Sequence, residues 1–502
     1  MQYPFVCLYK KSALTQIVVF FDDLAAKCPG DKMKLNDTIA AISTPMGKGG
    51  VAMIRISGEC AIEIADRVFV SKRDKSLCEC ESREMIYGEI FAPASERSAA
   101  GESRVCIDDG FAVVFRAPRS FTGEESVELY CHGGMLVTSK VLSAVLSAGA
   151  RLAEAGEFTR RAFVNGKMSL NEAESLGNLL DASNDTQVRL ARNGMRGALD
   201  KRLLAVYENL RSIMSGIFAA IDFPDEDLSE LSREDMIALA QSARAEVVAL
   251  LATYNTGRAV LSGIPTVICG RTNAGKSSVY NRLLGYDAAI VTDIEGTTRD
   301  VLKEQATVGS VTLLLCDTAG IRKTEDKVES IGIERAIGEI DASELALAVF
   351  DASAALTSED NELIARLSGQ GKVSIALLNK SDLKANTETT ERVRGAFEHC
   401  IDVCADSGDG FDALTALIND LFIDGSIDMD NDAVITGARQ FADLTVAKEC
   451  LGDAIAQLED GIPFDLCCVG IENAMAAVGQ VGGREISEDI VAEIFSKFCV
   501  GK

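Results

Sequence analysis

The segment Gly270–Ser277, with the sequence GRTNAGKS, constrains this chain more strongly than any other segment. It follows the apolar, strand-like run TVIC and opens a stretch with helical spacing through Val279 and Leu283. A glycine-rich turn between a strand and a helix exposes backbone amides to phosphate, and the pattern GxxxxGKS adds a lysine for the phosphates and a serine for magnesium. We therefore predict a P-loop, Ras-like α/β domain over residues 263–424.

Three further motifs, in order, indicate that the nucleotide is GTP. DTAG ends the run VTLLLC, where Asp317 is expected to support magnesium and the Gly320 amide to face the γ-phosphate. NKSD ends the run VSIALL, and the Asp382 carboxylate can accept from both N1 and the 2-amino group of guanine. Thr298 lies between the segment GRTNAGKS and DTAG, where a switch residue closes over the γ-phosphate. The expected GTP-binding residues are Asn273, Ala274, Gly275, Lys276, Ser277, Ser278, Thr292, Asp293, Ile294, Glu295, Gly296, Thr297, Thr298, Asp317, Thr318, Ala319, Gly320, Asn379, Lys380, Ser381 and Asp382.

The residues that activate water are less obvious from the sequence. Ile321 and Arg322 follow DTAG, so the glutamine that usually orients water is missing. Oxygen atoms of the loop TDIEGTTRD, with the amide oxygen of Asn273, could hold a monovalent cation near the phosphates and neutralise charge as an arginine finger does. Glu329, twelve residues after Asp317, could act through water as a base, although its spacing alone fits a solvated helix residue better.

The rest of the chain shows two patterns of apolar residues. Residues 37–166 alternate short apolar runs with Gly and Pro turns, which indicates an α+β domain. Residues 167–262 and 425–502 share a helical pattern, so an all-α domain interrupted by the inserted α/β domain is the economical interpretation. The acidic segment DGSIDMDNDA is expected to be a polar linker. Residues 1–36 are expected to be a non-native or disordered extension.

Composition narrows the class of protein. A net charge of −26 argues against a protein that coats nucleic acid by itself, and it leaves any such contact to a local basic patch or a partner. The fifteen cysteines are scattered and only two histidines are present, so a zinc site of Cys and His is not expected. His132 is expected to be a packing or turn residue. No stretch reaches the length of a membrane span, and a reducing cytoplasm is the expected compartment.

The chain ends on FCVGK, with Cys499 close to the carboxyl terminus. Acidic residues follow Ser487, which predicts a helix start at this point. Ile490, Ile494 and Phe498 then predict one apolar face that docks the helix and carries Cys499 to a fixed place. A buried, inert thiol is the alternative interpretation.

Taken together, these residues resemble the MnmE (TrmE) family of tRNA modification GTPases over residues 37–502. The matching segments are DTIAAISTPMGKGGVAMIRISG, SFTGEESVELYCHGG, GEFTRRAFVNGKMSLNEAESLGNLLDAS, AIDFPDED, GRTNAGKSS, AAIVTDIEGTTRDV, DTAGIRKTEDKVESIGIERA and FCVGK. The resemblance implies an N-terminal domain that dimerises and binds a tetrahydrofolate, a discontinuous helical domain, and an inserted G domain activated by potassium.

The resemblance also implies a reaction and its partners. With the flavoprotein MnmG (GidA), in a heterotetramer, such a protein adds an aminomethyl or carboxymethylaminomethyl group to carbon 5 of the wobble uridine of certain tRNAs. The one-carbon unit would come from 5-formyltetrahydrofolate or 5,10-methylenetetrahydrofolate, and the partner would carry FAD and NADH.

Carried over by motif, the resemblance assigns roles to individual residues. It gives magnesium to Ser277 and Thr298, potassium to Asn273, Thr292, Ile294 and Thr297, and the role of general base to Glu329. It places Arg55, Glu128, Lys167 and Lys502 in the folate pocket. Cys499 would lie near the one-carbon unit, where an adjacent Lys502 ammonium favours the thiolate.

Three positions depart from the family pattern. Thr272 replaces the usual Pro, Glu295 replaces a small residue beside the proposed cation loop, and Cys404 replaces the serine of the guanine-backing Ser-Ala pair. The last change predicts weaker nucleotide affinity. The competing hypothesis is a regulatory or ribosome-assembly GTPase that binds RNA without modifying it, because such factors share the NAGKSS and GTTRD loops. The folate-pocket residues and Cys499 separate the two hypotheses, since an assembly factor has no use for them.

Overall fold

The computed structural model describes residues 37–73, 75–92, 105–222, 231–285, 304–315, 338, 340–368, 372–484, 487–498 and 500–501. The chain forms two compact units. The first ends at Lys167 and also includes the chain from Val491 onward, whereas the second runs from Met168 to Ile490. The C-terminal residues therefore fold with the first unit.

The first unit contains a seven-stranded sheet with the order β3-β4-β5-β6-β2-β1-β7. Side chains alternate between its faces, so Ile54 and Ile56 of β2 are buried against helices α2 and α3 while Arg55 lies on the opposite face. The register pairs Arg55 with Glu128 of β6 and with Ala41 of β1. The elements are β1 (Ile39–Ile42), β2 (Val51–Ser57), α2 (Ala61–Val68), β3 (Phe69–Ser71), the 3-10 turn η1 (Leu77–Glu79), β4 (Met85–Phe91), β5 (Cys106–Phe115), β6 (Ser126–His132), α3 (Met135–Ser147), β7 (Arg151–Leu152), α4 (Glu157–Val164) and α17 (Glu488–Ser496).

Helix α17 begins where the sequence predicts, but its buried face differs from the predicted one. Val491 and Phe495 are buried, whereas Ile490 is 40% exposed. The ring of Phe495 lies 6.2 Å from that of Phe163 in α4. Both stripes have helical spacing, so the pattern alone could not choose between them. The contact between the two rings favours the Phe495 face.

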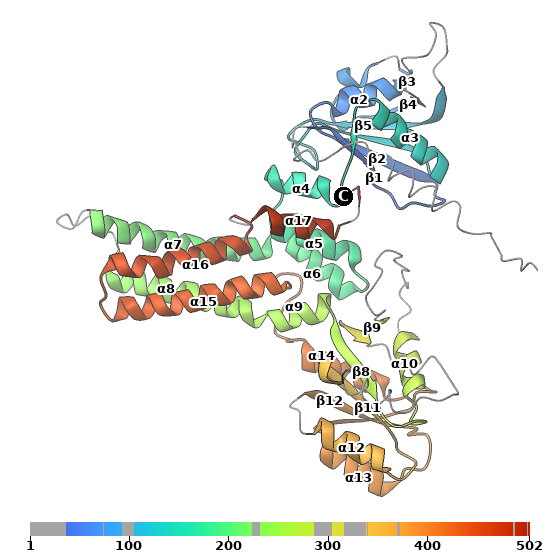
Figure 1. Ribbon diagram of the computed structural model, residues 1–502, viewed down its shortest axis with the longest axis vertical. Coiled ribbons are helices and arrows are strands. Elements are labelled where there is room, and N and C mark those ends of the chain that lie inside the picture. Colours follow the sequence, from blue (N-terminus) through green and yellow to red (C-terminus); the bar gives the residue numbers. More distant parts are fainter. Residues whose placement is uncertain are drawn as a thin grey trace, which may run out of the picture. The chain divides into compact units, whose positions relative to one another are not determined.

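Four long helices from both sides of the α/β segment pack into one bundle (Figure 1). Helices α7 (Ala198–Asp222) and α8 (Arg233–Ala252) precede that segment, and α15 (Ala438–Glu459) and α16 (Phe464–Val481) follow it. Leu210, Val247, Leu451 and Ile471, one from each helix, are fully buried in a common core. The predicted discontinuous all-α architecture is confirmed. Three shorter helices complete this part: α5 (Leu170–Asp181), α6 (Asp185–Met195) and α9 (Tyr254–Leu261).

One stretch of the described chain, Arg233–Leu261, is long and apolar enough to cross a membrane by length and composition alone. This differs from the prediction that no stretch reaches such a length. The face of α8 that carries Met236, Ala240 and Val247 is fully buried in the bundle. Only 28% of the apolar window is buried, and one stretch of this kind does not by itself establish a membrane span, because helices of bundles pass the same test.

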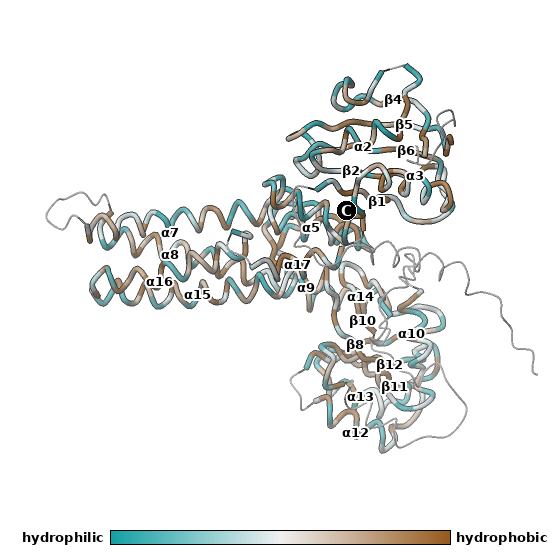
Figure 2. Tube along the Cα trace, turned by 45° about the horizontal axis from the view of Figure 1, so that its top comes forward, coloured by the Kyte–Doolittle hydropathy of each residue, from teal (hydrophilic) through white to brown (hydrophobic). Residues whose placement is uncertain are grey.

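The α/β segment forms a six-stranded sheet with the order β13-β12-β11-β8-β10-β9, in which all neighbours are parallel except β9 and β10. Strand β11 (Leu345–Asp351) is buried along its whole length, as expected for a parallel strand covered on both faces. Figure 2 colours the residues of this segment by hydropathy. The predicted α/β class is confirmed. The other elements are β8 (Ile264–Cys269), α10 (Lys276–Gly285), β9 (Glu304–Val308), β10 (Val311–Leu315), α12 (Ser358–Leu367), β12 (Val373–Asn379), α13 (Thr387–Ala396), β13 (His399–Val403) and α14 (Phe411–Phe422).

The segment between α14 and α15, predicted to be a polar linker, is packed against its neighbours. Its Met429 is buried in a small apolar cluster with Leu190 and Val260. Nearby, the Gln187 amide of α6 donates to the Val260 carbonyl at 2.8 Å and to the Thr312 hydroxyl of β10 at 3.2 Å. These contacts join the shorter helices to the sheet.

The shared core of the bundle predicts how substitutions on either side of the insertion act. Leu451→Ala is expected to lower the free energy of unfolding by about 2–5 kcal/mol, because it leaves a cavity among helices from both halves. Val446→Ala on the same helix, where the side chain is 50% exposed, is expected to change it by less than about 0.5 kcal/mol. Urea unfolding followed by circular dichroism measures both values, and equal losses would contradict the shared core.

Candidate functional site

The turn after β8 has the backbone conformation that its motif requires. Gly270 and Gly275 have φ angles of 147° and 99°, and a Cβ at Gly275 would lie 2.0 Å from Asn379 Nδ2. Asn273 also has a positive φ of 65°, which asparagine adopts more readily than most residues. The Lys276 ammonium donates to two backbone carbonyls of the loop at 2.8 Å, so the loop wraps around the ammonium. This is the geometry of a phosphate-binding loop.

Asn379 joins this loop to the rest of the nucleotide site. Its Nδ2 donates to the Ala274 carbonyl at 3.0 Å, and its Oδ1 accepts from the Ala405 amide at 3.1 Å. Because β8, β12 and β13 are parallel, the segments that follow them meet at one edge of the sheet. The sequence-predicted loops TNAGKS and NKSD, and the Cys404–Ala405 pair, are therefore brought together by one buried side chain.

The NKSD loop presents its acidic residue to solvent. The Lys380 ammonium lies 2.6 Å from Asp351, at the end of β11. Burial raises the pKa of Asp351, but hydrogen bonds from Lys380 and Ser353 outweigh it and hold that pKa below its ordinary value. Asp382 is exposed, and its Oδ1 accepts from Cys404 Sγ at 3.3 Å. A thiol donates more weakly than a serine hydroxyl. The reduced nucleotide affinity expected from Cys404 stays a prediction.

Several predicted site residues lie outside the described residues. They are Thr292, Asp293, Ile294, Glu295, Gly296, Thr297, Thr298, Asp317, Thr318, Ala319, Gly320, Glu329, Cys499 and Lys502. Ser277 and Ser278 are the second and third residues of α10.

On the other unit, Arg55 and Glu128 form a partly buried ion pair. Arg55 Nη2 lies 3.0 Å from Glu128 Oε1, with side chains 16% and 13% exposed. Glu128 Oε2 accepts from the Tyr130 hydroxyl at 2.7 Å, and burial, followed by that bond, raises the pKa of Tyr130 to about 12. The Arg55 guanidinium lies 5.1 Å from the ring centroid of Phe121 and 5.8 Å from that of Phe158. The pair thus faces aromatic walls, which sequence reasoning did not identify.

Lys167, the third predicted folate residue, contacts the loop that carries one of those walls. Its Nζ donates to the Pro118 carbonyl at 2.9 Å. Gly123 has a φ of 82°, and a Cβ there would lie 3.2 Å from the Lys167 side chain. Lys167 therefore secures the loop that holds Phe121 but does not contact Arg55 directly.

The C-terminal segment packs against the same unit as Arg55. Val500 forms an antiparallel bridge with Ala155, and the Ser43 hydroxyl donates to the Gly501 carbonyl at 2.8 Å. Gly501 has a φ of 98°, and a Cβ there would lie 2.2 Å from the Ile42 carbonyl oxygen. Only glycine can make this approach. The residues on both sides of Cys499 therefore belong to the unit that holds the Arg55–Glu128 pair.

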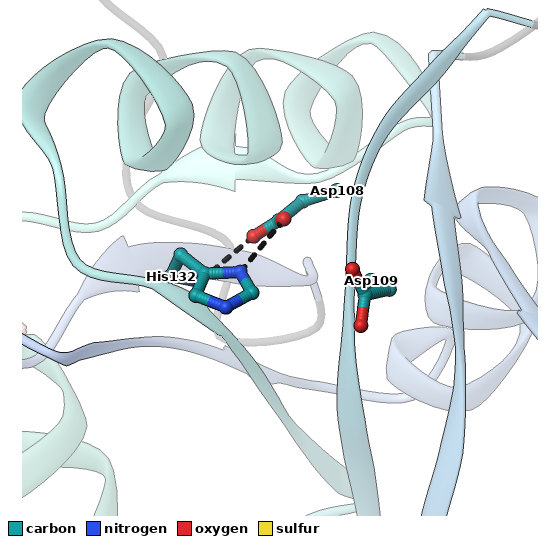
Figure 3. A group of neighbouring side chains, drawn as sticks. All are labelled: Asp108, Asp109 and His132. Carbon is teal, nitrogen blue, oxygen red and sulfur yellow. Dashed lines mark hydrogen bonds and ion pairs between the residues drawn. The ribbon is translucent and has the colours of Figure 1, made fainter.

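A third group of side chains lies at the ends of β5 and β6 (Figure 3). His132 Nδ1 lies 2.9 Å from Asp108 Oδ1, and the His132 backbone amide donates to Asp108 Oδ2 at 2.7 Å. Asp109 accepts from the Tyr87 hydroxyl at 2.8 Å. Asp108, Asp109 and His132 could each offer a metal one ligand atom, all within 4.8 Å of one another. Because both Asp108 oxygens already contact His132, we interpret the group as a clasp between strand ends.

Comparison with known proteins gives consistent matches over most of the chain. Residues 38–167 match the family described as GTP-binding protein TrmE N-terminus, and residues 170–499 match the MnmE helical domain. A tRNA modification GTPase MnmE of Lactobacillus helveticus is 38% identical over 466 residues, covering 93% of this chain and 98% of the relative. Proteins of the same description from Symbiobacterium thermophilum and Clostridioides difficile are 40% and 36% identical, covering 93% and 94% of this chain and 99% and 100% of theirs.

One solved structure that this chain resembles matches part of it. The G domain of FeoB from Methanococcus jannaschii is 17% identical, with a TM-score of 0.21, and the match covers 31% of this chain and 94% of that domain.

The exposed Asp382 carboxylate predicts a change of nucleotide preference. Asp382→Asn replaces an acceptor with a side chain that is half donor, so guanine loses charge-assisted hydrogen bonds worth about 1.5–3 kcal/mol. We expect GTP affinity to fall roughly tenfold to hundredfold, and xanthosine triphosphate to bind better than in the unchanged protein. Titration of fluorescent nucleotide analogues measures both constants, and unchanged GTP affinity would remove Asp382 from the guanine site.

The His132–Asp108 pair predicts a pH dependence. The hydrogen bond to Asp108 and the negative charge of Asp108 raise the pKa of His132 above 6.5. Burial raises the pKa of Asp108, but the hydrogen bonds from His132 outweigh burial and hold that pKa below 3.8. The stabilisation is complete between about pH 3.8 and 6.5, and is lost as pH falls through the Asp108 pKa or rises through the His132 pKa. Asp108→Asn is expected to lower the His132 pKa in an NMR titration, and an unchanged value would contradict the clasp.

Proposed function

Because the chain belongs to the MnmE family of tRNA modification GTPases, we propose that it is potassium-activated and works with the flavoprotein MnmG (GidA). The protein is a GTP hydrolase of tRNA modification, and it binds GTP in its G domain. The proposed product is a wobble uridine that carries an aminomethyl or carboxymethylaminomethyl group on carbon 5. The observation that carries the proposal is the docking of the residues beside Cys499 on the unit that holds Arg55 and Glu128.

The Arg55–Glu128 pair suits the pterin ring of a tetrahydrofolate. One edge of a pterin carries two N–H donors beside a carbonyl acceptor. Glu128 can accept from the donors while Arg55 donates to the carbonyl, and Tyr130 holds Glu128 in place. Phe121 and Phe158 offer apolar surface to the flat ring. Lys167 and Lys502 are then assigned to the acidic glutamate tail.

When bound, the tetrahydrofolate supplies the one-carbon unit. We assign Cys499 to the nucleophilic or acid–base assistance of its transfer, with the Lys502 ammonium favouring the thiolate. The contacts of Val500 and Gly501 support this role because they anchor the backbone immediately after Cys499. A regulatory or ribosome-assembly GTPase would have no use for this constellation.

The G domain provides the switch. In this proposal Ser277 and Thr298 hold magnesium, and Asn273, Thr292, Ile294 and Thr297 surround potassium. Glu329 acts as general base through water. Two chains dimerise through their N-terminal domains and join two MnmG chains, which carry FAD and NADH, in a cytoplasmic heterotetramer. GTP-dependent association of the two G domains shifts the population toward the modifying state.

Folate binding tests the assignment of Arg55. Equilibrium dialysis with 5-formyltetrahydrofolate is expected to show saturable binding that Arg55→Ala weakens roughly tenfold to hundredfold, because a charged donor is lost. Arg192→Ala, on an exposed position of α6, is the matched control and is expected to bind normally. Absence of saturable binding, or an Arg55→Ala variant that binds as well as the control, would defeat the folate assignment.

Potassium activation is tested by GTP hydrolysis in KCl and NaCl at equal ionic strength. The rate is expected to be roughly tenfold or more higher in KCl, since a cation beside the phosphates replaces an arginine finger. Asn273→Gly removes the amide oxygen but keeps the positive φ of 65°, so it is expected to abolish the difference without straining the loop. Equal rates in the two salts for the unchanged protein would rule out the cation mechanism.

A further inference from the structure

A cluster of cations lies on the first unit around the connection between β5 and β6. Arg116 and Arg119 belong to this connection, and Arg83 lies just before β4. We refer to Arg83, Arg116 and Arg119 as the cationic rim. Arg83 and Arg119 are exposed and Arg116 is half-buried.

Two guanidinium groups of the rim, those of Arg83 and Arg116, are held by backbone carbonyls. Arg116 Nη2 donates to the Cys78 carbonyl at 2.7 Å and to the Cys80 carbonyl at 3.3 Å. Arg83 Nη2 donates to the Arg119 carbonyl at 3.4 Å. A carbonyl orients a guanidinium without cancelling its charge, and it leaves most of the five N–H donors for a ligand. By contrast, Arg55 and Arg161 on the same unit are paired with carboxylates.

The backbone conformation of Arg83 fixes the direction of its side chain. Its φ is 71°, a left-handed conformation that is uncommon for a residue with a long side chain. Its amide donates to the Val114 carbonyl at 2.7 Å, which fixes the residue beside the end of β5. This conformation holds Arg83 where its side chain reaches the Arg119 carbonyl.

The local charge contrasts with that of the whole chain. Glu84, the carboxylate next to Arg83, is already paired with Arg73 at 3.0 Å. Glu79 and Glu81 lie on the exposed segment before β4, so the rim is not free of negative charge. In residues 73–84 and 116–125, taken with Lys167, cations and carboxylates are equal in number, whereas the whole chain has a net charge of −26. The cations of this neighbourhood are Arg73, Lys75, Arg83, Arg116, Arg119 and Lys167.

The rim is continuous with the candidate folate site. Arg119 precedes Phe121 by two residues, and the Phe121 ring lies beside Arg55. Lys167 bonds the Pro118 carbonyl within the same connection. A polyanion held on the rim would therefore lie next to the Arg55–Glu128 pair.

We propose that the cationic rim binds the phosphate backbone of the tRNA substrate beside the one-carbon site. This inference rests on the proposed function, because it names the surface by which an otherwise acidic chain holds its nucleic acid. Phosphate oxygens match the planar, multiply donating guanidinium groups, and contacts of this kind give affinity without sequence information. The rim thus positions the substrate, while selection of the uridine belongs to other contacts.

The test measures binding of fluorescently labelled tRNA to the full chain over a range of salt concentrations. Arg83→Gln/Arg116→Gln/Arg119→Gln is expected to raise the Kd roughly tenfold or more at low salt and to reduce the log–log salt slope by roughly two to three. The matched control, Arg192→Gln/Arg196→Gln/Lys201→Gln, removes the same charge from exposed positions of the helical part. It is expected to leave the slope nearly unchanged. Arg119→Glu alone, which leaves the Arg116 contacts in place, is expected to weaken binding in the same direction.

Folate dialysis on the same variants distinguishes failure of this inference from failure of the proposed function. Unchanged tRNA binding by the rim variants, with normal folate binding, would overturn the rim alone. Equal loss in the rim and control variants would show that overall charge governs binding, which also overturns it. If the rim variants bind tRNA normally but no longer bind a polyglutamylated folate, the rim would be assigned to the glutamate tail of the folate. Absence of folate binding in the unchanged protein would instead overturn the function on which the rim depends.

Discussion

The buried guanidinium of Arg161 is the interaction on which the candidate one-carbon site depends. It is 1% exposed and contacts carboxylates from three segments: Asp37 before β1, Glu124 before β6, and Glu157 at the start of α4. Burial lowers the pKa of Arg161, but these carboxylates outweigh it, so the group stays charged. Removing one partner from a buried network of this kind costs about 3–5 kcal/mol. Because Phe121 and Phe158 lie on two of the joined segments, the network fixes the aromatic walls beside Arg55 before any ligand arrives.

In the nucleotide site, the uncharged side chain of Asn379 plays the same part as Arg161. Asn379 bonds the phosphate-binding loop and the Ala405 amide at once, and the absence of a Cβ at Gly275 makes room for it.

The order of the segments along the chain explains how the C-terminal residues belong to the first unit. The helical bundle is completed only after the G domain, so the C-terminal segment emerges late and can return to the first unit, where Gly501 allows the backbone to approach β1. The C-terminal segment from Val491 onward therefore belongs to the same compact unit as Arg55 and Glu128.

The sequence predicted the features whose signals are local. The P-loop and the NKSD loop need short, strict patterns after strands. The spacing of apolar residues in the rest of the chain predicted the fold classes correctly. Features that depend on register or on distant contacts were not predictable. The pairing of Arg55 with Glu128 follows from strand register, and the docking face of α17 from the contact of Phe495 with Phe163. The acidic linker packs because it carries a few apolar residues, Ile427, Met429 and Ala433, whose packing the acidic composition of the segment conceals. Arg161, an apparently ordinary charge in EFTRR, gave no sign of its buried network.

The most direct test of the central claim follows the carbon atom itself. The protein, MnmG, GTP, the partner's cofactors and an unmodified tRNA would be incubated with a tetrahydrofolate that carries a ¹³C-labelled one-carbon unit, and the wobble nucleoside would be analysed by mass spectrometry. We predict that the label appears in the group on carbon 5 of the uridine, and that Cys499→Ser hydrolyses GTP normally but yields no labelled nucleoside. Modification with unlabelled carbon by the unchanged protein, or normal labelling by Cys499→Ser, would contradict the account.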